Sequence, residues 1–118
     1  MYGAGKYYVW KTTDCDELKG WQIFGEDGKM IGEGILWNFG ADGSAELGCR
    51  ILPEYHGNGY GKKAFGAIAD FAEKSLNLKL WARCFRQNKS SEKMILASGF
   101  EEFKSDDTFH YFERNAKI

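Results

Sequence analysis

The chain has 118 residues, with 16 basic and 17 acidic side chains and a formal net charge of −1. The length fits one domain over residues 1–118. The composition is not that of a disordered protein, because 43% of the residues are hydrophobic and 16% are aromatic. The near-neutral balance provides no basic field for nucleic acid, and no run approaches the roughly 20 apolar residues of a membrane helix.

Cysteine usage indicates a reducing compartment. The three cysteines are Cys15, Cys49 and Cys84, and none belongs to a C-x-x-C pair. An odd count without such a pair argues against a disulfide framework and a zinc ribbon, so we expect free thiols and no metal. The first residues also lack the apolar core of a signal peptide. We therefore expect a soluble, cytoplasmic protein without a membrane partner.

The N-terminal half predicts an antiparallel meander. Asp27-Gly28 is a hairpin turn signal because glycine accepts a positive φ, and residues 41–44 form a second turn of the same kind. The polar segment 12–20 fits a loop or one short helical turn. The expected strands cover residues 6–11, 21–24, 29–39 and 45–52.

The C-terminal half predicts two helices among further strands. Residues 62–76 have a helical period, and we expect Gly66 to let this helix approach the sheet closely. Ser90 or Ser91 is expected to cap a second helix, which runs through Ala97 and ends near Gly99. The apolar face of the first helix contains Phe65, Ile68, Ala69, Ala72 and Leu76. The remaining strands cover residues 78–84, 100–104 and 108–114.

This order predicts the fold class. A strand–helix–strand unit in the middle requires parallel pairing, whereas hairpins at both ends require antiparallel pairing. The result is an α+β fold in which helices pack on a mixed, mostly antiparallel sheet.

A glycine-rich loop precedes the first expected helix. Residues 53–65 hold glycines at alternating positions, Gly57, Gly59 and Gly61. Asn58-Gly59 is by itself a common turn dipeptide, so a plain surface turn is one interpretation. The other is an anion cradle, because consecutive backbone N–H groups at a helix start can hold a pyrophosphate.

Two nucleotide motifs fit this loop poorly. The Walker pattern fails because His56 stands where Gly is required and Lys63 stands where Ser or Thr is required. Residues 59–64 match G-x-G-x-x-A of dinucleotide sites. The linker before them is too long for that motif, and the strand ending near Cys84 offers no acid for a ribose.

Taken together, two segments resemble the GNAT superfamily of acyl-CoA-dependent N-acetyltransferases. Residues 56–61 match its pyrophosphate loop, Gln/Arg-x-x-Gly-x-Gly/Ala, with His56 in the first position. Residues 88–100 resemble its segment N-x-x-[A/S]-x-x-x-x-x-x-x-G-F, and 45–61 is similar to the ribosomal-protein N-acetyltransferase-like branch. The resemblance covers roughly residues 18–114 and implies a GNAT fold with acetyl-CoA as acyl donor.

The resemblance also implies a coenzyme site where two parallel strands, 45–52 and 78–84, splay apart. Pantetheine would pair with main chain near Ile51 and Leu52, and the side-chain amide of Asn88 would contact it. Ser91 would contact pantetheine or the thiolate. Asn88 and Ser91 also have a simpler interpretation, as polar residues at a helix start. The pyrophosphate would be held by His56, Gly57, Asn58, Gly59, Tyr60 and Gly61.

The chemistry implied by the resemblance is direct attack of a primary amine on the thioester in a ternary complex. Glu46 is the expected general base, directly or through water, although a solvated strand carboxylate is the alternative; Glu33 is a weaker candidate. Many relatives have Tyr where this chain has Ile95. Either Ser91 or a nearby water then assists the thiolate, or the thiolate leaves unassisted.

A second departure is the short segment between residues 11 and 21, which has almost no room for the helices that wall the acceptor site in relatives. The acceptor side is then open or closed by another subunit, as in a homodimer. Three tryptophans, Trp10, Trp21 and Trp37, provide an apolar wall, a dimer surface or simply core packing. The alternative function is a non-catalytic acyl-CoA-binding module with a degenerate acceptor site.

Overall fold

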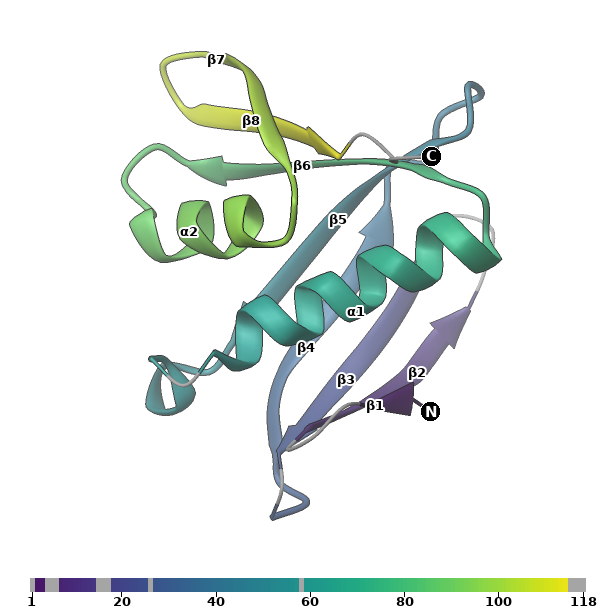
Figure 1. Ribbon diagram of the computed structural model, residues 1–118, viewed down its shortest axis with the longest axis vertical. Coiled ribbons are helices and arrows are strands. Elements are labelled where there is room, and N and C mark those ends of the chain that lie inside the picture. The colour runs from purple at the N-terminus through teal and green to yellow at the C-terminus, as the bar shows by residue number, and fades with distance from the viewer. Residues whose placement is uncertain (1, 4–6, 15–17, 26, 58, 115–118) are drawn as a thin grey trace.

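The computed structural model describes residues 2–3, 7–14, 18–25, 27–57 and 59–114. In these ranges a single eight-stranded sheet has the order β1-β2-β3-β4-β5-β6-β8-β7 (Figure 1). Only β5 and β6 pair in parallel, which confirms the mixed α+β fold. The strands are β1 (Tyr2–Gly3), β2 (Tyr7–Asp14), β3 (Lys19–Gly25), β4 (Met30–Trp37), β5 (Ser44–Ile51), β6 (Lys79–Phe85), β7 (Glu101–Ser105) and β8 (Phe109–Arg114). The helices are α1 (Tyr60–Ser75), α2 (Lys89–Ala97) and the single 3-10 turn η1 (Pro53–Tyr55).

The predicted turns of the meander are confirmed. Asp27 Oδ1 accepts a hydrogen bond from Lys29 N at 3.0 Å, and Gly28 has φ +81°. In the next turn Asp42 Oδ1 accepts from Ser44 N at 3.1 Å and from Ser44 Oγ at 2.6 Å. Such aspartate turns reverse the chain within a few residues, so consecutive strands pair directly.

The prediction of a loop or helical turn over residues 12–20 is wrong at both ends. Strand β2 continues to Asp14 and β3 already begins at Lys19, and these two residues pair across the sheet. Cross-strand hydrogen bonds extend the ladder into a polar segment whose local propensity did not indicate a strand. Strand β1 was not predicted either.

The core lies between one face of the sheet and α1, which crosses the middle strands (Figure 1). The predicted apolar face of α1 is confirmed: Phe65, Ile68, Ala69 and Ala72 are buried and Leu76 is partly buried. The close approach is made at Gly34 of β4, where an added Cβ would overlap Cδ1 of Ile68. The expectation for Gly66 is wrong, because a Cβ there faces α2 and lies 4.0 Å from Ser98 Oγ.

The N-cap of the second helix lies two or three residues before the predicted one. Asn88 is the N-cap and its side chain accepts from Ser91 N, so neither Ser90 nor Ser91 caps the helix. At the other end Gly99 has φ +89°, as expected for a residue that ends a helix. No helix in the described ranges is long and apolar enough to cross a membrane.

The other face of the sheet, which we call the open face, carries the alternate side chains of the strands. Trp21 points to the core and is 1% exposed, whereas Trp37 lies on the open face, where the Arg83 guanidinium sits 6.0 Å from its ring centre. The side chain of Trp10 is outside what the structure describes. The open-face residues used below are Gln22, Glu33, Ile35, Glu46, Gly48 and Arg50.

Candidate active site

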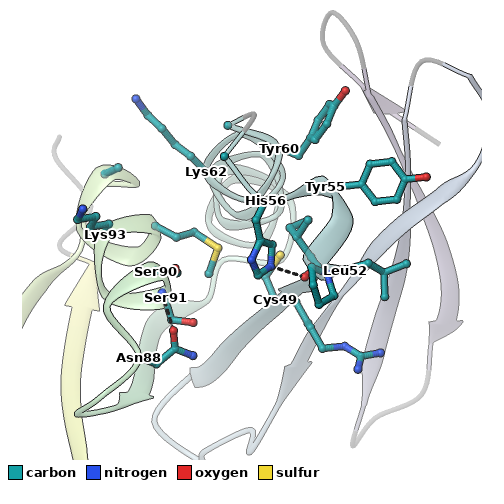
Figure 2. Close-up of a pocket in the computed structure, with 18 residues that line it drawn as sticks. Cys49, Leu52, Tyr55, His56, Tyr60, Lys62, Asn88, Ser90, Ser91 and Lys93 are labelled. Carbon is teal, nitrogen blue, oxygen red and sulfur yellow. Dashed lines mark hydrogen bonds between the residues drawn. The ribbon is translucent and has the colours of Figure 1, made fainter.

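The site begins where β5 and β6 separate. Their ladder runs from the pair Ser44–Lys79 to the pair Glu46–Trp81 and ends there within the described chain, although both strands continue. A cavity of about 610 Å³ occupies the resulting angle (Figure 2). Its lining combines the end of β5, the glycine loop, the first turn of α1, and one side of α2 from its N-cap Asn88 to its last residue Ala97. The two segments singled out from the sequence are therefore brought together around one cavity.

The end of β5 directs main-chain N–H groups toward this first cavity. Leu52 N donates to Ile31 O of β4 at 2.8 Å. Main-chain groups of successive residues in a strand point to opposite sides, so the N–H groups of Ile51 and Cys49 point toward the angle between β5 and β6. Cys49, Ile51 and Leu52 all line the cavity. This edge can pair with an extended, amide-bearing ligand in the way that another strand would.

The glycine loop leads directly into α1. Gly57 has φ +84° and Gly59, the N-cap of α1, has φ +77°, and an added Cβ would touch nothing at either position. These glycines are thus required by backbone conformation and not by space. Gly61 is different, since a Cβ there would lie 3.0 Å from Met94 Sδ of α2. The predicted ligand residue Asn58 lies outside the described residues.

The loop sets the start of α1 against the cavity. The first N–H groups of a helix have no partner within it, and the helix dipole adds partial positive charge there. Tyr60 and Gly61 of this first turn line the cavity, together with Lys62 of α1 and Lys93 of α2 (Figure 2). The arrangement suits an anion such as a pyrophosphate.

His56 is held against the strand end. Its Nε2 donates to Ile51 O at 2.7 Å, and both residues line the cavity (Figure 2). The ring therefore already has a protein partner in the position where the family loop usually has Gln or Arg. A contact of His56 with phosphate stays a prediction.

Asn88 and Ser91 both line the cavity from the α2 side, where the sequence had placed them. Asn88 Oδ1 accepts from Ser91 N at 3.1 Å (Figure 2). This cap uses the oxygen of the amide only, because the Nδ2 group makes no hydrogen bond within the described chain. Asn88 can therefore cap α2 and donate to a ligand at the same time.

Glu46 lies at the last paired position of β5, where the strands begin to diverge. Its side chain is only 5% exposed and is held by two donors. Asn38 Nδ2 donates to Oε1 at 2.8 Å, and Arg83 Nε donates to Oε2 at 3.0 Å. Glu46 is not among the residues that line the first cavity. These two donors use two of the roughly four lone-pair sites of the carboxylate, so each oxygen can still accept a proton.

A second cavity of about 410 Å³ lies across β3, β4 and β5. Its lining includes Glu33 and also Cys49 and Arg50, which border the first cavity as well. The two cavities therefore meet at the same residues of β5. Two ligands, one in each cavity, would approach each other at this strand.

The two described cysteines are poor nucleophiles. Burial raises the pKa of the Cys49 thiol to about 12, with a smaller contribution from the Glu33 carboxylate. Burial also raises the pKa of Cys84, and Glu92 and Glu102 add to this effect. Because the thiolate is the reactive form, neither residue favours a covalent acyl-enzyme. No group of three or more potential metal ligands occurs in the described ranges.

Several lining residues were not found from the sequence. Tyr55, Ser90, Lys93 and Met94 border the first cavity, and Gln22 borders the second. Lys93 and Met94 lie three and four residues after Ser90, about one helical turn, so helical spacing within the α2 motif was the available signal. Gln22 had no comparable signal, because its place depends on strand register.

Comparisons with known proteins agree with this geometry. Residues 3–101 match the family model described as an acetyltransferase (GNAT) domain. No curated protein matches significantly.

Solved structures of N-acetyltransferases share the fold. Campylobacter jejuni PseH in complex with acetyl coenzyme A has a TM-score of 0.74 at 24% identity, over 87% of this chain and 71% of that one. Vibrio cholerae spermidine N-acetyltransferase SpeG has a TM-score of 0.73 at 18% identity, and the match covers 83% of this chain and 64% of that one. Vibrio fischeri ribosomal-protein-S5-alanine acetyltransferase has a TM-score of 0.73 at 19% identity, and the match covers 82% of this chain and 61% of that one. The chain belongs to the GNAT acetyltransferase family, whose acyl donor is acetyl-CoA.

Proposed function

We propose that this protein transfers the acetyl group of acetyl-CoA to a primary amine of a small molecule or peptide. The observation that carries the proposal is the pair of cavities meeting at Cys49 and Arg50 of β5. The first suits the coenzyme and the second provides a separate approach for the amine. A strand edge with outward N–H groups lies between them.

In the first cavity the chain's own groups suit different parts of the coenzyme. The main-chain N–H of Ile51 and the Nδ2 group of Asn88 suit the amides of the pantetheine arm. The predicted contact at Leu52 is less well supported, because Leu52 N already donates to Ile31 O and Leu52 O already accepts from Tyr55 N. The first turn of α1, with Gly57 and Gly59 before it, suits the pyrophosphate.

The reaction we propose is direct attack within a ternary complex. The neutral amine nitrogen attacks the thioester carbonyl carbon, the C–N bond forms, and the C–S bond breaks. An ammonium substrate loses two protons in total, one to solvent through a base and one to the coenzyme thiolate. An outward N–H near Cys49 would donate to the oxyanion. Elevated thiol pKa values support direct attack over a cysteine intermediate.

Glu46 remains the proposed general base, and Glu33 is its rival. Glu46 lies at the origin of the splay, but its two oxygens already accept from Asn38 and Arg83. Glu33 borders the second cavity and its side chain is 54% exposed. Glu33 is thus closer to where an amine would enter. Ser91 is proposed to stabilise the leaving thiolate from the α2 side of the first cavity.

The test combines binding and turnover. Isothermal titration with acetyl-CoA should show one site, and a thiol-release assay over a panel of amines should show acetyl-CoA consumption that depends on the amine. Binding without turnover on any amine would favour the non-catalytic module. Absence of binding would contradict both.

A further inference from the structure

The second cavity has a polar end and an apolar floor. Gln22, Glu33 and Arg50 are neighbours in register across β3, β4 and β5, so their side chains form one row on the open face. The next row on that face is Gly20, Ile35 and Gly48. Two glycines flank one isoleucine there, which leaves a hollow beside the polar row.

The charges of this cavity form a close pair of opposite sign. Arg50 Nη2 lies 2.9 Å from Glu33 Oε1. Among the described residues that line the cavity, Glu33 is the one acid and Arg50 the one base. A ligand that carries an ammonium and a carboxylate close together would satisfy both groups. A polyamine would meet one carboxylate and one repelling guanidinium.

The pair can open to admit such a ligand. The side chains of Arg50 and Glu33 are 68% and 54% exposed. Ion pairs between exposed side chains contribute little stability, so exchanging the internal pair for two ligand contacts costs little. The guanidinium can then bind a carboxylate through two parallel hydrogen bonds.

The hollow limits what the rest of the ligand can be. A Cβ added at Gly48 would lie 3.1 Å from Cγ2 of Ile35, so the space above Gly48 is bounded by that side chain. Leu18 and Ile35 line the cavity and make its wall apolar. An apolar side chain of modest size fits this surface better than a charged one.

We propose that the acceptor is a free α-amino acid with an apolar side chain, held with its carboxylate on Arg50 and its ammonium on Glu33. This inference rests on the proposed function and names its substrate class. Glu33 pairs with Arg50, the chain neighbour of Cys49, so the amine would lie one strand away from the place where the two cavities meet. One proton of the ammonium passes to Glu33 and on to solvent. The second moves to the departing thiolate as the C–N bond forms and the C–S bond breaks.

The experiment compares alanine, valine and leucine with their carboxamides, which keep the amine and lose the carboxylate. The free amino acids should have kcat/KM about tenfold or more above the amides, because the bidentate contact to Arg50 is lost in the amides. Arg50→Gln should remove this preference by lowering activity on the acids alone. Lys74→Gln, at an exposed position of α1, is the matched loss of a positive charge and should leave the preference unchanged.

The hollow is tested by two opposite changes. Gly48→Ala should shift preference from leucine toward alanine, and Ile35→Ala should shift it toward leucine. Because Arg50 and Cys49 also border the first cavity, acetyl-CoA affinity is measured for every variant by titration. If the affinity of a variant for acetyl-CoA stays near that of the wild type, its changed substrate preference arises from altered binding of the acceptor.

Failure of the amino-acid inference can be distinguished from failure of the proposed acetyl transfer. Equal rates for acids and amides, or a preference for spermidine, would overturn this inference and leave acetyl transfer intact. If no amine is acetylated, titration of valine and valinamide into the coenzyme A complex decides. Preferred binding of valine that disappears in Arg50→Gln would support the inference without the proposed function. No preference would overturn it.

Discussion

Cys49 sits at the boundary of the two cavities, where a reactive thiol would intercept the acetyl group. Its side chain is not suited to that reaction. The pKa of about 12 lies above the unperturbed range, so the thiolate is scarce at neutral pH and becomes more abundant only as the pH rises toward 12.

We therefore expect Cys49 to resist alkylation. At pH 8 iodoacetamide should label it at least about tenfold more slowly than an unperturbed thiol of pKa near 8.5, with a rate that climbs with pH. Peptide mapping by mass spectrometry resolves each cysteine. An acetyl group found on Cys49 after mixing with acetyl-CoA would contradict direct attack.

Glu46 combines a structural role with its proposed catalytic one. Glu46→Gln keeps the shape but leaves the Arg83 guanidinium without its carboxylate, so we expect a loss of about 1–3 kcal/mol in the free energy of unfolding. Urea denaturation measures this loss. We also expect lower turnover with nearly unchanged acetyl-CoA affinity.

Comparison of the two glutamine variants decides the catalytic role of Glu46. If Glu46 is the base, Glu46→Gln should lower kcat well below the value of Glu33→Gln at every pH. If Glu33→Gln lowers kcat more, the base is Glu33. Unchanged turnover in Glu46→Gln would remove Glu46 from the mechanism.

At the scale of elements, Asn88 at the start of α2 has an observed structural contact and a proposed ligand contact. Asn88 Oδ1 caps the helix, and Nδ2 is proposed to donate to pantetheine. Asn88→Asp keeps the accepting oxygen and removes the donor, whereas Asn88→Ala removes both. We expect Asn88→Ala to lose about 1 kcal/mol of stability and Asn88→Asp to lose less.

Both Asn88 variants should bind acetyl-CoA more weakly if Nδ2 contacts pantetheine. Thermal unfolding and titration separate the two effects. Normal affinity in Asn88→Asp would restrict Asn88 to capping.

The packing of α1 on the sheet depends on Gly34. Gly34→Ala forces Ile68 to move within a packed core, so we expect a loss of about 1–3 kcal/mol. Gly66→Ala is the matched control in α1 itself. Its new Cβ has room, and alanine is favoured over glycine in a helix interior, so stability should rise by about 0.5–1 kcal/mol. Equal effects of the two changes would contradict this packing.

The sequence predicted some features of the helices and strands correctly and missed others. The periodicity of α1 and the Asp27-Gly28 turn are local signals, and both are confirmed. The limits of β2 and β3 were missed because pairing with a neighbouring strand sets them. The cap of α2 was misplaced because Asn and Ser are both good caps and only the fold selects between them.

The complete lining of the first cavity could be identified only from the folded structure. Residues 56–61 and 88–91 were expected to meet, and seven of their predicted members, His56, Gly57, Gly59, Tyr60, Gly61, Asn88 and Ser91, do line it. The bond from His56 to Ile51 O and the occupied carboxylate of Glu46 were not predicted. Both depend on side-chain directions that no spacing in the sequence specifies. The second cavity depends on the register of three strands.

For the molecule as a whole, we expect acetyl-CoA to stabilise the fold, because it would fill the cavity where β5 and β6 separate. At a concentration about 100 times its Kd, a ligand that binds only the folded state adds about 2.7 kcal/mol. Thermal unfolding should therefore shift upward by several degrees.

Two glycines of like conformation provide the control for this stabilisation. Gly57 in the loop and Gly28 in the β3–β4 turn have φ near +84° and +81°, and neither has a close neighbour. Replacement by alanine should cost similar stability at both positions without ligand. Only Gly57→Ala should reduce the shift produced by acetyl-CoA. Equal shifts would argue against a role for the loop in binding.

Strand β5 borders three different regions of the molecule. Leu47 and Ile51 point into the core, Glu46 and Arg50 point to the open face, and the outward main chain borders the first cavity. A small displacement of this strand is therefore transmitted to both cavities. Any such coupling must be reciprocal: the factor by which the donor changes acceptor affinity equals the factor by which the acceptor changes donor affinity.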